Sequence, residues 1–103
     1  MFPENEESFN LVKSILLDTI PKDISLRKHK EDNVLLVTNK HQTLYFLNNT
    51  AALFLSYCNE KLTVKEIIDK MSDILEVQNN ILTDDIVELI RVLQKDRIVY
   101  IEV

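Results

Sequence analysis

Side chains that could act as nucleophiles, acids, bases or metal ligands are few and scattered in this sequence. Neither His29 nor His41 has a histidine or cysteine three or four positions away, so the spacing of a zinc site is absent. Cys58 lies in an apolar stretch, which favours a buried small side chain over a nucleophile. Asp84 and Asp85 form a carboxylate pair, and their better interpretation is as acids at a helix start. We therefore expect a protein that is not an enzyme and binds no metal.

Nucleotide and nucleic-acid chemistry is also disfavoured. Tyr45 and Phe46 could stack on bases, but 17 acidic residues against 12 basic ones leave a net charge of −5. Binding to phosphates requires a basic footprint, so we expect these aromatic side chains to pack in the core or an interface. The chain has no glycine, which excludes glycine-rich phosphate-binding loops. We expect no cofactor and no nucleic-acid partner.

The composition predicts one domain of ordinary size, because 103 residues with 46% hydrophobic side chains can bury one core. No apolar run approaches the roughly 20 residues that a membrane span requires, so no membrane association is expected. The N-terminal residues 1–7 are acidic and lack the pattern of a signal peptide. Together with the single cysteine, this predicts a cytoplasmic protein.

Turns without glycine need another residue that tolerates positive φ. Asparagine is the next best choice, because its short polar side chain tolerates the left-handed region. We expect this conformation at asparagines in the predicted turns, namely Asn39, Asn59, Asn79 and Asn80.

A first helix is predicted for residues 1–20, because apolar residues recur there three or four positions apart and Pro21 ends the pattern. Three short strands should follow, at Ile24–Lys28, Val34–Thr38 and Thr43–Leu47. In the third strand Tyr45 and Leu47 point to one face, and Leu44 and Phe46 point to the other. We expect the first helix to cover Leu44 and Phe46, in its own chain or in a swapped neighbour, because a small sheet should not leave an apolar face bare.

Three further helices and a closing strand complete the pattern. The first helix of this group is expected over 50–58 with Asn49 or Thr50 as N-cap, and the second opens with a capping box at Thr63–Glu66. The third begins near Thr83, and residues 98–101 form the last strand. Apolar residues three or four positions apart give the second and third of these helices a core face, formed by Val64, Ile67, Ile68, Met71 and Leu75 and by Leu82, Ile86, Leu89, Ile90 and Leu93. The fold class is therefore α+β and winged-helix-like, with a three-stranded antiparallel sheet packed on three helices and an extra N-terminal helix. We expect an N-terminal helical extension at residues 1–21 and the winged-helix domain at residues 22–103.

Four segments carry a family resemblance through their order and spacing. They are the hairpin end Leu44–Asn48, the helix entry Asn49–Ala52, the helix start Leu62–Ile68, and the helix Asp84–Ile90 running into Ile98 and Val99. In this order they resemble the PqqD family, whose domains are recognition elements for ribosomally synthesised, post-translationally modified peptides. The family often has glycine where this chain has residues 59–61 and 96–97, and the N-terminal helix is an addition.

The resemblance implies a peptide chaperone without catalysis. Such domains bind the leader of a precursor peptide and present it to a modifying enzyme, often a radical SAM enzyme or a cyclase. By this resemblance the leader adds a strand to the third strand and lies against the third of the later helices. The expected peptide-binding residues are Thr43, Leu44, Tyr45, Phe46, Leu47, Val87, Ile90, Arg91, Gln94 and Lys95.

Alternatives remain open at this point. Val87 and Ile90 could receive an apolar leader residue and Arg91 and Lys95 could meet acidic ones, or the first two could be core and the others solvated. A winged-helix fold is also compatible with a DNA-binding regulator, although the acidic balance disfavours one. A third alternative is an adaptor that forms homodimers through its N-terminal helix.

Overall fold

The computed structural model describes residues 6–102, with side chains described for residues 11–101. This part of the chain contains one helix followed by four strands, then three helices and a final strand. Their order is α1 (Glu6–Leu17), β1 (Ile20–Asp23), β2 (Arg27–Glu31), β3 (Val34–Thr38), β4 (Leu44–Leu47), α2 (Asn49–Tyr57), α3 (Val64–Leu75), α4 (Asn79–Lys95) and β5 (Val99–Glu102).

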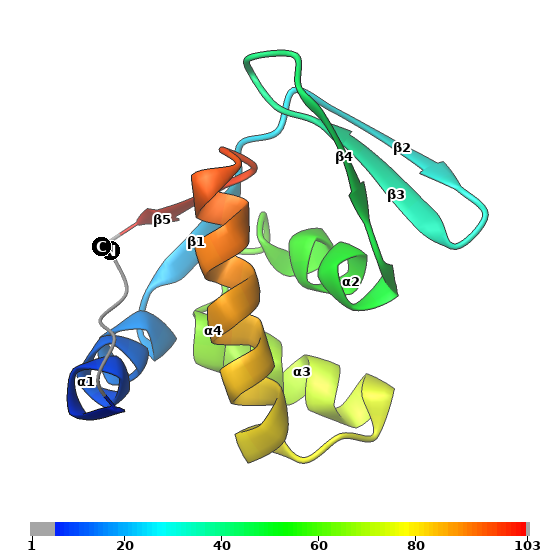
Figure 1. Cartoon of the computed structure of the whole chain (residues 1–103). Helices are drawn as coiled ribbons and strands as arrows, with labels where there is room; N and C mark the ends of the chain where they lie inside the picture. Colours follow the sequence, from blue (N-terminus) through cyan, green and yellow to red (C-terminus); the bar gives the residue numbers. More distant parts are fainter. Residues whose placement is uncertain (1–5, 103) are drawn as a thin grey trace.

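Two antiparallel sheets flank the helices. The larger sheet has the order β2-β3-β4, and the smaller one pairs β1 with β5 (Figure 1). The larger sheet covers α2, and the β2–β3 hairpin projects beyond that helix as a wing. The predicted α+β fold, with a three-stranded antiparallel sheet on three helices and an additional N-terminal helix, is confirmed.

The helix starts follow local capping rules. Thr63 and Glu66 form the predicted capping box at α3, with the Thr63 N–H donating to Glu66 Oε1 at 2.9 Å. These hydrogen bonds to Thr63 lower the pKa of the Glu66 carboxyl, because they favour its charged form. Helix α2 is capped one residue earlier than expected, by the Asn48 side chain. Helix α4 begins at Asn79, not at Thr83, whose hydroxyl donates to the Asn79 carbonyl oxygen inside the helix.

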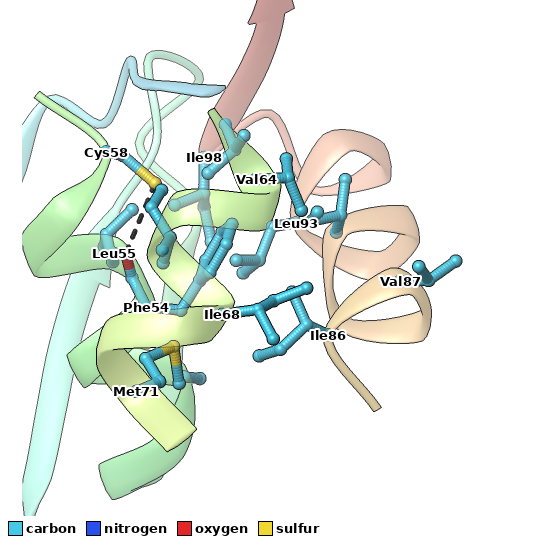
Figure 2. Close-up of a cluster of buried hydrophobic side chains, with 14 of the residues drawn as sticks. Phe54, Leu55, Cys58, Val64, Ile68, Met71, Ile86, Val87, Leu93 and Ile98 are labelled. Atoms are coloured by element: carbon cyan, nitrogen blue, oxygen red, sulfur yellow. Dashed lines mark hydrogen bonds between the residues drawn. The ribbon is translucent and has the colours of Figure 1, made fainter. Parts of the chain in front are cut away.

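The core lies where α2, α3 and α4 meet. Phe54 of α2 is fully buried, and Ile68 and Met71 of α3 and Ile86 and Leu93 of α4 are buried with it (Figure 2). The apolar stripes read from the sequence therefore do face inward on α3 and α4. From the sheet, the inner-face residues of β3 and β4 close this core, as the period of two along a strand requires.

The N-terminal helix does not cover the outer face of the larger sheet, so that expectation is wrong within one chain. Helix α1 packs against α3, and its Lys13 forms an ion pair with Asp84 of α4 at 3.0 Å. Leu44 and Phe46 remain exposed. Leu16 explains the placement, because it is buried in the helical core and fixes α1 there.

Helix α1 also ends before Pro21. The Thr19 hydroxyl donates to the Leu16 carbonyl oxygen at 2.6 Å, and the chain then enters β1. Pro21 lies within β1, which pairs on one side only, and a strand of that kind tolerates the missing N–H. The expected division between residues 21 and 22 falls inside this strand.

The first of the three predicted sheet strands was expected at Ile24–Lys28, but it lies at Arg27–Glu31 as β2. Its side chains are all exposed, so it carries no apolar alternation that would mark it in the sequence. Pairing with β3 defines it instead, with His29 opposite Leu36.

Positive φ occurs at charged and polar residues, not at the asparagines that we expected. Within residues 6–102 it occurs at Asp32, Gln42, Lys61, Glu76 and Arg97. Lys61 and Arg97 stand in the two segments where the resembled family often has glycine. The asparagines serve other purposes, since Asn79 starts α4 and Asn39 is a buried hydrogen-bonding centre.

Asn39 joins the wing to the helices. Its side-chain oxygen accepts from the N–H groups of His41 and Thr43 at 2.9 and 3.0 Å, which shapes the turn between β3 and β4. Its Nδ2 donates to the carbonyl oxygen of Asp96 at 2.9 Å, just after α4. One buried amide thus sets both the turn and its distance from α4.

We expect Asn39→Ala to lower the free energy of unfolding by about 1–3 kcal/mol, because buried groups lose their hydrogen-bond partners. Urea denaturation measures this loss. The matched control is Asn59→Ala at an exposed position, which should stay within about 0.5 kcal/mol of the parent. Equal effects of the two substitutions would show that the Asn39 side chain does not stabilise the contact between the β3–β4 turn and α4.

Candidate peptide-binding site

Strand β4 is an edge of the larger sheet. The Asn39 N–H donates to the Thr43 carbonyl oxygen at 3.0 Å, which places the main-chain groups of Thr43 toward β3. Because this direction alternates along an antiparallel strand, the N–H and C=O groups of Leu44 and Phe46 point to the open edge. No strand in residues 6–102 pairs with that edge. It can accept an extended peptide as a fourth strand.

The side chains of β4 divide between the two faces as the sequence predicts. Tyr45 is half-buried and Leu47 is buried, both against the helical core. Leu44 and Phe46 lie on the outer face and are 50% and 71% exposed. Phe46 stands beside Leu36 of β3. The edge therefore combines open main-chain groups with an uncovered apolar surface.

Two of the expected site residues on α4 are not on the surface. Val87 and Ile90 are both 0% exposed, so neither can receive a peptide side chain in this conformation. Ile90 belongs to the central core, and Val87 points away from the cluster around Phe54 (Figure 2). We expected these two residues to form an apolar pocket for the peptide. That expectation is wrong, because both side chains are part of the core.

Arg91, Gln94 and Lys95 are exposed. Arg91 and Lys95 share a stripe of α4 with Asp84, because residues spaced by seven and eleven return to the same side of a helix. Asp84 is the residue that pairs with Lys13 of α1. Arg91 also pairs with Glu88, at 3.7 Å between Nη1 and Oε2. This stripe is thus the side of α4 on which α1 lies.

The opposite flank of α4 bears Leu89 and Val92. Successive residues turn by about 100°, so Leu89 lies across the helix from Val87. Leu89 is half-buried and Val92 is 45% exposed. Figure 1 places α1 and β4 on opposite sides of α4. Leu89 was expected on the core face of this helix, which its half-buried position fits in part, and Val92 was not among the expected site residues.

Comparison with known protein families matches residues 33–99 to the family described as Coenzyme PQQ synthesis protein D (PqqD). The match covers most of the chain and spans β3, β4, α2, α3, α4 and the first residue of β5, whereas β1 and β2 lie outside it. This chain belongs to the PqqD family. Comparison with curated proteins and with solved structures finds no match.

Membership of the PqqD family implies a role in the biosynthesis of PQQ or of modified ribosomal peptides. Proteins of this family are generally non-catalytic chaperones. The resemblance read from the sequence is therefore confirmed, and helix α1 lies outside the matched region.

The histidine and cysteine side chains, which could act as nucleophiles, bases or metal ligands, do not come together in the described residues. No group of three or more histidine, cysteine, aspartate or glutamate side chains among the described residues could hold a metal ion. His29 and His41 are exposed on β2 and in the β3–β4 turn. None of the helices described is long and apolar enough to cross a bilayer.

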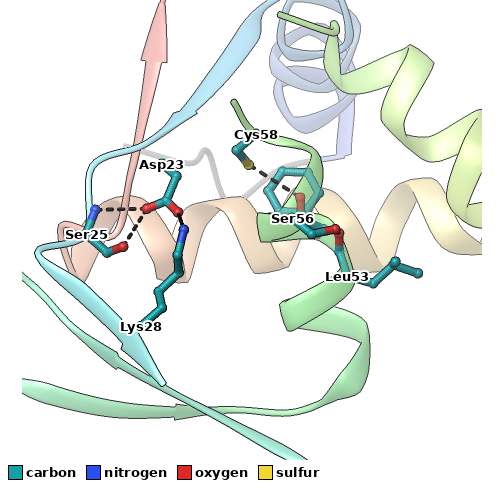
Figure 3. Close-up of polar contacts among 7 residues, drawn as sticks. Asp23, Ser25, Lys28, Leu53, Ser56 and Cys58 are labelled. Atoms are coloured by element: carbon teal, nitrogen blue, oxygen red, sulfur yellow. Dashed lines mark hydrogen bonds and ion pairs between the residues drawn. The ribbon is translucent and has the colours of Figure 1, made fainter. Parts of the chain in front are cut away.

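Cys58 follows α2 and is buried, as expected. Its Sγ donates to the Phe54 carbonyl oxygen at 3.5 Å (Figures 2 and 3). Burial, with a smaller effect of the Asp23 charge, raises the pKa of the Cys58 thiol from 9.0 to about 12. The thiolate is the reactive form, so this thiol is inert in the folded protein.

We expect Cys58 to resist iodoacetamide at pH 8 in the native protein and to react in urea, as followed by mass spectrometry. The raised pKa also makes stability depend on pH. Between pH 9 and about 12 the unfolded thiol loses its proton while the folded one keeps it, so stability falls as pH rises. Cys58→Ala should lose this component, and a native thiol that alkylates as fast as free cysteine would contradict the burial.

Proposed function

We propose that this protein binds the leader region of a ribosomally synthesised precursor peptide and presents the peptide to a modifying enzyme, itself performing no chemistry. The modifying enzyme would be of the radical SAM or cyclase type. The observation that carries this proposal is the open edge of β4 in a chain of the PqqD family. We also propose that the protein acts in the cytoplasm.

Strand addition suits such a task. Hydrogen bonds to the main chain of an edge strand provide affinity for an extended peptide, and neighbouring side-chain surfaces provide specificity. The groups available are the N–H and C=O of Leu44 and of Phe46. The peptide would lengthen the β2-β3-β4 sheet by one strand and enter the space between β4 and α4.

The residues of α4 proposed to contact the leader differ from those expected from the sequence. We propose Leu89 and Val92 in place of the buried Val87 and Ile90, because they lie on the flank of α4 away from the stripe that pairs with α1. An apolar leader residue would pack on Leu89 and Val92. Arg91, Gln94 and Lys95 would contact the leader only if it reaches over the solvent face of α4.

The first test separates main-chain from side-chain recognition. Phe46→Pro removes the outward N–H, and an edge strand tolerates proline at such a position. Phe46→Ala removes the same side chain and keeps the N–H. We expect the proline variant to bind about tenfold more weakly than the alanine variant, since one hydrogen bond is worth about 0.5–1.5 kcal/mol.

The probe is a fluorescently labelled leader of the short precursor peptide that we expect to be encoded beside this protein's gene, titrated by polarisation. Amide NMR spectra of both variants confirm that the fold is kept. Equal affinities would mean that the edge main chain of β4 takes no part. Absence of any binding by the parent protein would refute the proposed function itself.

The second test identifies the flank of α4 that faces the leader. We expect Val92→Asp to weaken binding about tenfold, because a carboxylate in an apolar contact must be desolvated. Arg91→Glu combined with Lys95→Glu should change mainly the association rate and its salt dependence, as rim charges do. Stopped-flow titration with the same leader measures both. The reverse ranking would restore the Arg91 flank as the wall.

A further inference from the structure

The edge of the larger sheet opposite β4 is formed by β2, and its side chains are mostly basic. Strand β2 reads Arg27, Lys28, His29 and Lys30 before Glu31, and all these side chains are exposed in a chain with net charge −5. The main-chain N–H and C=O groups of Leu36 in β3 point toward β2, where His29 lies opposite. Because this direction alternates along a strand, the N–H and C=O groups of Lys28 and Lys30 point to the open edge.

A groove of about 440 Å³ lies beneath this edge, between the β2–β3 hairpin and α2. Its floor is a stripe of α2 with residues three and four positions apart, and its wall comes from the inner face of β2 and β3. The groove is deep because two floor positions, Ala52 and Ser56, have small side chains. The residues that form it include Lys28, Lys30, Leu35, Ala52, Leu53 and Ser56.

The two lysines of the groove differ in their partners. Lys28 forms an ion pair with Asp23, whose side chain is 2% exposed and also accepts from Ser25 Oγ at 2.6 Å (Figure 3). Lys28 therefore balances a buried carboxylate. Lys30 has no hydrogen bond or ion pair within the described residues, and no carboxylate lines the groove. The groove thus has an unbalanced positive charge over an apolar floor.

We propose that the open edge of β2 and this groove form a second docking site, for an extended peptide segment of another protein with acidic and aliphatic side chains on each of its faces. The segment adds a strand beside β2. Its aliphatic side chains fill the groove over Ala52 and Leu53, and an acidic side chain on the same face meets Lys30. Acidic side chains on its other face meet Arg27. Since β2 and β4 are opposite edges, this site is separate from the proposed leader site and both can be occupied together.

The test uses the full chain and an acetylated, amidated decapeptide in which pairs of glutamates alternate with pairs of leucines, so that each face of the strand carries both. We expect amide NMR shifts at Lys28, Lys30 and Ala52, and an affinity that falls with salt. Lys30→Glu should weaken binding about fivefold or more, the effect of about 1 kcal/mol at a charged surface contact. Ala52→Leu fills the groove without a change of charge and should weaken binding as well.

Lys40→Glu is the matched control, with the same charge change at an exposed lysine in the β3–β4 turn, and should bind as the parent does. Urea midpoints verify that each variant is folded. The proposal is overturned if the peptide does not bind, if its shifts centre on β4, or if Lys30→Glu and Lys40→Glu act alike. Equal binding of a lysine–leucine peptide, or binding of single-stranded DNA in its place, would also overturn it.

Discussion

The attachment of the β2-β3-β4 sheet to the helices is the constraint on which the rest of the structure depends. At one end of the sheet the buried Asn39 amide joins the β3–β4 turn to the end of α4. Along the inner face, Val37 and Leu47 are buried in the helical core. An amide with these partners cannot shift without leaving buried polar groups unsatisfied, so the separation of β4 and α4 is held firmly. A peptide-binding edge gains from this, because less ordering is required on binding.

The two open edges of this sheet differ in chemistry. The β4 edge displays Leu44 and Phe46, which suits a partner with apolar side chains, whereas the β2 edge displays bases above a groove. Exposed edges normally invite unwanted pairing, and lysines on an edge strand discourage it for all but a partner with opposite charge. The same lysines that discourage unwanted edge pairing can therefore select an acidic segment. Under the proposed function, two separate binding surfaces would let the protein hold a peptide and a second partner together.

The lack of glycine is accommodated at a cost in backbone conformation. Lys61 and Arg97 take φ values near 59° at the ends of helical segments, where a residue with a Cβ is less favourable by about 1–2 kcal/mol. The surrounding contacts impose these conformations. Ile98, directly after Arg97, is fully buried, and its N–H donates to the Leu93 carbonyl oxygen at 2.9 Å. The core thus decides where the chain turns, whatever residue stands there.

Local signals in the sequence determined much of this protein by themselves. Three features depend on neighbouring residues and appear where the sequence predicts them: the capping box at Thr63 and Glu66, the apolar stripes of α3 and α4, and the two faces of β4. The family resemblance rests on the same segments. Tertiary structure alone decided the rest: the burial of Val87, the position of α1 and the strand β2, whose exposed side chains have no periodicity. Each depends on what packs against a residue from a distant part of the chain, and no local pattern encodes that.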